Sequence, residues 1–156
     1  MKKEILNNKS ESDFDILKDI FIIFKLTSKY YIKLCEKFNI KQIEFQALYL
    51  LYISENKGVK MSSLGEKLEM ARSGVTILVD RMALAGLVKR RPDVEDRRIM
   101  NVMITEKGNE IMNEIFPINE IFNVSILDFI KQDEKEILYK LIIKIKEKLE
   151  SKVSMV

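Results

Sequence analysis

The sequence of 156 residues contains no histidine and a single cysteine, Cys35. Without histidine the chain lacks the commonest general base and a frequent metal ligand. One cysteine cannot form a disulfide within the chain, and it supplies too few soft ligands for a structural zinc site. These absences disfavour an enzyme with a common catalytic triad, and they predict that the protein uses no metal and no cofactor.

Long hydrophobic runs are also missing. No apolar stretch approaches the roughly 18 to 20 residues that span a bilayer, and the charged start of the chain does not continue into a signal-peptide core. Hydrophobic residues make up 47% of the chain and charged residues of both signs 33%, which is typical of a folded protein rather than a membrane or disordered one. We therefore expect a single domain, residues 1–156, in the cytoplasm, with no separate catalytic module.

The formal net charge of +3 is too small to indicate a nucleic-acid partner by itself. The distribution of arginine is more informative, because every arginine lies between positions 72 and 98 while the flanking segments use lysine. Guanidinium groups match phosphate and guanine edges and enter narrow minor grooves. The cluster therefore favours a functional role for the arginines, such as contact with phosphate or base edges. The alternatives are a chance grouping and local ion pairs with Asp93, Glu95 and Asp96.

The five glycines all lie between positions 58 and 108, which leaves both ends of the chain for long helices. Residues 13–38 carry two neighbouring apolar stripes at helical spacing, so this helix needs a partner. Residues 110–151 hold a further stripe that Pro117 should kink, and a last helix that a capping box of Asp133 and Glu136 should start. We predict that both segments are dimerisation helices; a monomer that folds them onto its central module is the alternative.

Residues 40–108 are predicted to form the central module. An apolar helix over 40–54 should end at Asn56, Lys57 and Gly58. A short helix should begin near Ser62, with a capping box of Ser63 and Glu66, and a third helix should follow a turn at 69–71 and run to about Ala85, where Gly86 closes it. Strands over 87–91 and 98–104 should flank a charged loop. This order predicts a winged helix-turn-helix, a mainly α fold with a small β-hairpin wing.

The third helix of this module is the candidate recognition helix. Its core-facing residues should be Val75, Leu78, Val79 and Met82, and its outward residues Arg72, Ser73, Thr76, Ile77 and Asp80. Such a helix enters a major groove with its N-terminal turns. Arg72 would then contact a phosphate or a guanine edge, Ser73 and Thr76 would hydrogen-bond, and Ile77 would give shape or thymine-methyl contacts. A helical hairpin without a ligand is the alternative.

The predicted hairpin carries cations on both sides of its tip, Lys89, Arg90 and Arg91 before it and Arg97 and Arg98 after it. They should lie where backbone phosphates or a minor groove would be. Asp96 precedes Arg98 by two residues and can hold its guanidinium extended. The alternative is an exposed pair worth about 0 to 1 kcal/mol, and we favour that interpretation for Asp80 and Arg81.

Several short segments follow one another in the order and spacing of a known family. They are Leu64-Gly65-Glu66-Lys67-Leu68, Val75-Thr76, Val79-Asp80-Arg81-Met82, Gly86-Leu87-Val88-Lys89-Arg90, Asp93 to Arg98 and Ile104-Thr105-Glu106-Lys107-Gly108. With these segments and its long terminal helices, the chain resembles the MarR family of bacterial transcriptional regulators. The resemblance implies a triangular homodimer joined by the terminal helices, and it makes Arg98, oriented by Asp96, the wing arginine that enters the minor groove.

The resemblance also implies regulation. Members typically repress transcription and release DNA when a small, often aromatic or lipophilic anion, or an oxidant, alters the spacing of the recognition helices. Family geometry points to an effector site lined by Phe24, Tyr31, Phe45 and Tyr49, with interior packing as the alternative. Cys35 lies at the far end of the first helix from the reactive cysteine of peroxide-sensing relatives, so core packing is the better interpretation.

Some positions depart from the family pattern. Gly74 and Ile77 stand where members often carry polar or basic residues, Gly65 replaces a usual alanine, and Ala71 is a poor N-cap. We predict a homodimeric regulator, a repressor, that binds an inverted repeat of double-stranded DNA with its recognition helices roughly 34 Å apart. A winged helix used as a protein-interaction module is the main alternative.

Overall fold

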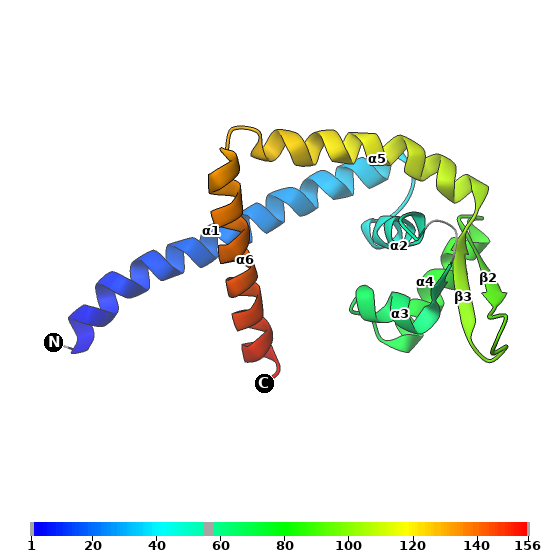
Figure 1. The fold of residues 1–156 in the computed structure, drawn as a ribbon, viewed down its shortest axis with the longest axis horizontal. Coiled ribbons are helices and arrows are strands. Elements are labelled where there is room, and N and C mark those ends of the chain that lie inside the picture. Colours follow the sequence, from blue (N-terminus) through cyan, green and yellow to red (C-terminus); the bar gives the residue numbers. More distant parts are fainter. Residues whose placement is uncertain (1, 55–57, 156) are drawn as a thin grey trace. The chain divides into compact units, whose positions relative to one another are not determined.

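The computed structural model describes residues 2–54 and 58–155, with side chains described from residue 13 onward. In these residues the elements follow the order α1 (Lys2–Lys37), α2 (Gln42–Tyr52), β1 (Val59–Lys60), α3 (Met61–Lys67), α4 (Arg72–Leu84), β2 (Val88–Pro92), β3 (Met100–Ile104), α5 (Glu106–Leu127) and α6 (Gln132–Val153) (Figure 1). The predicted class, mainly α with a small β-hairpin, is confirmed. The chain divides into two compact units, Met1–Asn113 and Glu114–Val156.

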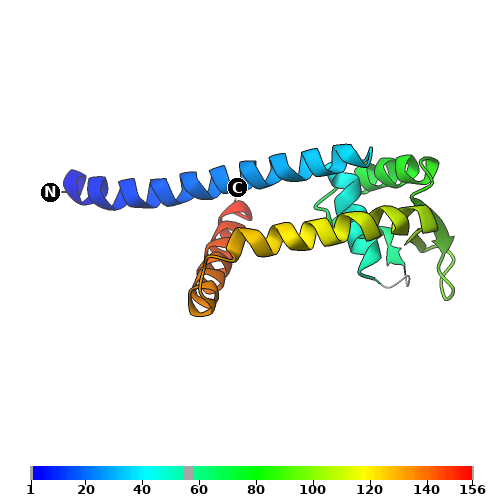
Figure 2. The same ribbon diagram turned by 90° about the horizontal axis from the view of Figure 1, so that it is seen from above.

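Helix α1 begins at Lys2, whereas the sequence predicted a start at Asp13. The extension is reasonable because neither glycine nor proline occurs before Gly58, so polar residues with moderate helix propensity continue the helix. In both views α1 leaves the winged module as one long helix (Figures 1 and 2). None of the helices in the described part of the chain is long and apolar enough to cross a membrane.

The module formed by α2, α3, α4 and the sheet has the predicted core. On α4 the buried residues are Val75, Leu78, Val79 and Met82, as their spacing predicted. Neighbouring elements contribute further fully buried side chains to this module, among them Leu48, Leu51, Leu64 and Val102. A continuous apolar core of this kind holds α4 in a fixed orientation and leaves its opposite face exposed.

The sheet has three antiparallel strands in the order β1-β3-β2, one more strand than the predicted hairpin. Strand β1 pairs Val59 with Val102 and Lys60 with Asn101. In the hairpin, Pro92 pairs with Met100, so the strand extends one residue into the predicted loop and its partner begins at Met100 instead of Arg98. Proline is tolerated there because β2 is an edge strand.

Two predicted capping boxes are wrong, although the start of α3 lies within one residue of the predicted Ser62. Helix α3 begins at Met61, directly after β1, and shows no side-chain cap, so Ser63 and Glu66 form no capping box. Helix α6 begins at Gln132, where the N–H of Lys131 donates to Glu134 at 3.0 Å, so Asp133 is not the cap. Asn56 and Lys57, the predicted stop of the second helix, lie outside the described residues.

The turns on either side of α4 agree better with the sequence. Ala71 precedes the helix without a side-chain cap, as its residue type predicted. Gly86 closes the helix with φ +75°, and Glu69, in the turn between α3 and α4, has φ +53°. Helix α5 continues through Pro117 and ends at Leu127.

Candidate nucleic-acid interface

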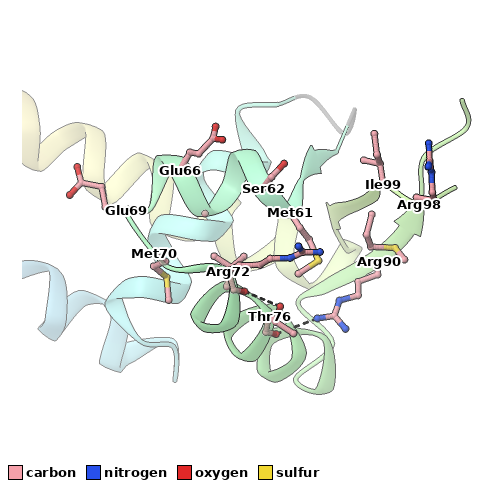
Figure 3. Close-up of a pocket in the computed structure, with 13 residues that line it drawn as sticks. Met61, Ser62, Glu66, Glu69, Met70, Arg72, Thr76, Arg90, Arg98 and Ile99 are labelled. Atoms are coloured by element: carbon pink, nitrogen blue, oxygen red, sulfur yellow. Dashed lines mark hydrogen bonds between the residues drawn. The ribbon is translucent and has the colours of Figure 1, made fainter. Parts of the chain in front are cut away.

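The exposed face of α4 carries the residues predicted to face outward. Arg72, Ser73, Ile77 and Asp80 are exposed and Thr76 is half-buried. The hydroxyl of Thr76 donates to the carbonyl oxygen of Arg72 at 3.0 Å. Arg72 extends from the first turn of α4 toward Met61 of α3, as Figure 3 shows. The first turns of this helix therefore present a guanidinium and a hydroxyl to a ligand.

A groove of about 860 Å³ lies between α3, the start of α4 and the hairpin. It brings together four of the predicted site residues, Arg72, Thr76, Arg90 and Arg98 (Figure 3). Ser73, Ile77, Lys89, Asp96 and Arg97 are not among its lining residues. The groove is also lined by residues that sequence reasoning did not single out as a site, namely Met61, Ser62, Gly65, Glu66, Glu69, Met70, Val75, Ile99 and Met100.

Arg98 lies on the approach to β3 and is held by Asp96, as predicted. Its Nε donates to Oδ1 of Asp96 and its Nη2 to Oδ2, both at 3.1 Å, and its backbone N–H donates to Oδ1 at 3.0 Å. The hydrogen bond from the guanidinium lowers the pKa of Asp96 below its usual range. The Arg98 side chain is nevertheless 91% exposed, so the carboxylate orients the cation without burying it.

Asp93 explains part of the acidity at the hairpin tip, and its role was missed from the sequence. Its carboxylate accepts hydrogen bonds from Asn101 Nδ2 at 2.8 Å and from the backbone N–H groups of Glu95 and Asp96 at 3.0 and 3.3 Å. These bonds, that from Asn101 foremost, lower the pKa of Asp93. An aspartate that begins a charged loop often binds the following N–H groups, and this was the available signal.

Arg90 is not a free cation on the hairpin, because its guanidinium is bound by two residues of α4. Its Nη1 lies 2.5 Å from Oδ1 of Asp80, and its Nη2 donates to the carbonyl oxygen of Thr76 at 3.2 Å. Arg90 therefore ties β2 to the recognition helix and shares its charge with Asp80. The interpretation of Asp80 and Arg81 as a surface pair is wrong, because each binds a residue of another element.

Arg81 pairs with Glu44 of α2, whose carboxylate is largely buried. The Nε of Arg81 lies 2.6 Å from Oε1 of Glu44, and Oε2 accepts the backbone N–H of Lys41 at 2.7 Å. Glu44 thus caps α2 and anchors α4 at the same time. A single carboxylate in an otherwise apolar helix was a signal for a buried partner, because an unpaired buried charge is costly.

The start of α5 is fastened to the end of the recognition helix. Thr105 Oγ1 donates to the carbonyl oxygen of Gly86 at 2.7 Å and accepts the N–H of Gly108 at 3.1 Å. Lys107 Nζ donates to the carbonyl oxygen of Ala85 at 2.8 Å, where a cation complements the C-terminal end of α4. These contacts fix the angle between the recognition helix and the first turns of α5.

Three of the four residues predicted to line an effector site lie together. Tyr31 stacks on Phe45 with ring centroids 5.7 Å apart, and Phe45 contacts Tyr49 at 6.4 Å. Phe24 lies two turns earlier on α1 and is 65% exposed. Cys35 is buried, which confirms core packing, and burial followed by the charge of Glu44 raises the pKa of its thiol to about 11.

These features define a winged helix-turn-helix protein with a cationic hairpin beside an exposed recognition helix, the arrangement of proteins that bind duplex DNA. Comparison with known proteins agrees, since the family model described as the MarR family matches residues 38–99. The HTH-type transcriptional regulator MhqR of Bacillus subtilis (strain 168) is 31% identical over 101 residues, which cover 64% of this chain and 68% of MhqR.

Other relatives extend the comparison. The transcriptional repressor MprA of Escherichia coli (strain K12) is 32% identical over 85 residues, which cover 54% of this chain and 48% of MprA. The fold is similar to that in the crystal structure of the S. aureus MepR–DNA complex, with a TM-score of 0.76, 18% identity and coverage of 83% of this chain and 93% of that one. The chain belongs to the MarR family, and it is a DNA-binding transcriptional regulator.

Proposed function

We propose that this regulator is a homodimeric, sequence-specific repressor that binds an inverted repeat of duplex DNA. The observation that carries the proposal is Arg98, whose guanidinium is held outward by Asp96 beside the groove at the start of α4. A preoriented and exposed arginine is suited to a narrow minor groove, because the negative potential there is strongest. Arg97 and Lys89, both exposed, contact the adjacent phosphates.

In the proposed complex α4 enters the major groove with its N-terminal turns. Arg72 contacts a phosphate or a guanine edge, Ser73 and Thr76 hydrogen-bond with phosphates or bases, and Ile77 contacts base edges. Arg90 acts through Asp80 and Thr76 by setting the hairpin against the helix. Each chain therefore fixes the distance between its two DNA-binding elements, α4 and the hairpin.

Dimerisation through residues 13–38 and 110–151 is supported by their exposed apolar side chains. On α1, Phe14, Phe21 and Phe24 are between 60% and 69% exposed, and on α6 Leu141 and Ile142 are each 51% exposed. Surfaces of this kind mark interfaces, since a monomer rarely exposes so many large apolar side chains. Two chains would then place their recognition helices roughly 34 Å apart, one turn of DNA.

Repression released by a small aromatic or lipophilic effector is the regulatory part of the proposal. The name of MprA, a repressor, supports the sign of regulation. The ring cluster of Tyr31, Phe45 and Tyr49 supports the site, since α2 also holds the recognition helix through Glu44 and Arg81. We further propose that the protein acts in the cytoplasm and has no catalytic activity.

Selection of bound duplexes from a random pool at physiological salt tests the proposal. A palindromic consensus is expected, and the wild-type protein should shift it as two chains per duplex. Arg98→Ala should lower the affinity about tenfold or more, whereas Lys41→Ala, which removes an exposed cation just before α2, outside the groove and the proposed dimerisation segments, should leave it unchanged. An empty selection would favour a protein-interaction module, and equal affinity of Arg98→Ala would remove the wing from the interface.

A further inference from the structure

The exposed face of α4 carries an apolar side chain, Ile77, at its middle. Counting about 100° per residue, Ser73, Ile77, Asp80 and Leu84 all lie within about 30° of the line opposite the buried side of the helix. Ile77 is 66% exposed and lies one turn after Ser73, near the middle of α4. The most prominent side chain at the middle of the recognition helix therefore offers no hydrogen bond.

Polar groups around Ile77 are already engaged within the chain. Asp80 pairs with Arg90 and Arg81 pairs with Glu44. The Thr76 hydroxyl uses its proton on the carbonyl oxygen of Arg72. Donors for base edges on this face are thus concentrated in the first turn, and the next turn makes contact through the branched hydrocarbon of Ile77.

Only one kind of base edge in the major groove gains from such a contact. A hydrocarbon beside an amino or carbonyl edge desolvates it without a partner, which is unfavourable. The C5-methyl group of thymine is apolar and projects into the major groove, so its burial against Ile77 is favourable. A methyl group at C5 of cytosine occupies the corresponding position on that pyrimidine ring.

We propose that Ile77 is a specificity-determining residue that selects a pyrimidine with a C5-methyl group in each half-site. The inference rests on the proposed function, since it requires that α4 enters a major groove. It adds that one operator position is recognised by its methyl group and not by its hydrogen-bonding edge. Thymine and 5-methylcytosine are then accepted alike at that position, while deoxyuridine and cytosine are disfavoured.

The test uses the palindromic duplex selected by the wild-type protein. Each thymine is replaced in turn by deoxyuridine, which removes one methyl group and leaves the base pair intact. At one symmetric position the replacement should weaken wild-type binding roughly fourfold per half-site, the factor that corresponds to burying one methyl group. Ile77→Ala should bind the thymine and deoxyuridine duplexes equally. Leu84→Ala, which shortens a 92% exposed leucine near the end of the same helix, should keep the wild-type ratio.

A second pair of duplexes carries cytosine or 5-methylcytosine at the same position, and methylation should raise wild-type affinity by a similar factor but leave Ile77→Ala unaffected. Circular dichroism shows whether each variant is folded. The loss of affinity when Arg98→Ala is added to the variant should equal the loss in the wild-type background, which shows that the contact of the hairpin with DNA is unchanged. Equal binding of every thymine and deoxyuridine pair by the wild-type protein would overturn the inference, as would an unchanged ratio in Ile77→Ala. Failure to select any duplex would instead overturn the proposed function itself.

Discussion

Replacement of Gly108 by alanine should destabilise the joint between α5 and the recognition helix. A Cβ atom at Gly108 would overlap the carbonyl oxygen of Leu87 and lie 2.7 Å from Cγ1 of Ile104. Neither neighbour yields easily, because both residues are buried and the Leu87 oxygen accepts the N–H of Thr105 at 3.1 Å. The backbone would have to move, and the Thr105 hydrogen bond would stretch.

The size of the effect follows from these contacts. Overpacking of this kind costs about 1 to 3 kcal/mol. A weakened backbone hydrogen bond adds about 1 kcal/mol. The better helix propensity of alanine returns about 1 kcal/mol. We expect Gly108→Ala to lower the free energy of unfolding by about 1 to 3 kcal/mol.

Urea denaturation followed by circular dichroism measures this difference, at one fixed protein concentration because the stability of a dimer depends on concentration. Gly74→Ala is the matched control, since a Cβ there would meet the flexible end of Met70, its Cε, at 3.2 Å. That change should be neutral or stabilise by up to about 1 kcal/mol. Equal stability of Gly108→Ala and wild type would refute the reasoning about the joint.

Three further predictions concern buried or paired charges. Folding raises the pKa of Cys35 from 9.0 to about 11, so the thiol of the unfolded chain ionises first as the pH rises. The free energy of unfolding should therefore fall between pH 9 and 11, as urea titrations at a series of pH values would measure. In Cys35→Ala this contribution to the fall should be absent. Arg81→Met leaves the carboxylate of Glu44 without its cation and should cost about 1 to 3 kcal/mol, with a smaller cost when Glu44→Gln is already present, as a double-mutant cycle would report. Arg90→Gln should change stability by no more than about 1 kcal/mol because the pair with Asp80 is partly exposed. Gel shifts should show a larger loss of operator affinity for it, and unchanged affinity would argue against a positioning role.

The winged module could be predicted from the sequence because its signals are local. The spacing of the four buried residues on α4 reports the buried side of that helix, and Gly86 marks its end by the φ that glycine adopts freely. Asp96 and Arg98 are two residues apart, so their contact was also visible. Such features depend on residues that are close together in the sequence, so contacts with distant segments do not alter them.

Other features could not be predicted, because they depend on contacts between distant segments. Strand β1 has two residues, too few to show an alternating pattern, and it forms because Val59 pairs with Val102 of β3. The pairing of Arg81 with Glu44 spans 37 positions of the chain. The capping boxes were misplaced because α3 follows directly on a strand and α6 is capped by Glu134, and neither helix begins at a serine or aspartate cap.

Site-directed cleavage of the selected duplex tests most directly whether the wing and the recognition helix of one chain lie on the same DNA. An iron chelate attached to Ser73→Cys or, separately, to Arg97→Cys reports the position of each element, because the native Cys35 is buried and stays unlabelled. Each chelate should cut at two positions related by the symmetry of the site, with the Ser73→Cys pair roughly one DNA turn apart and the Arg97→Cys pair outside it. Cleavage from one position alone, or scattered cleavage from both, would contradict the account.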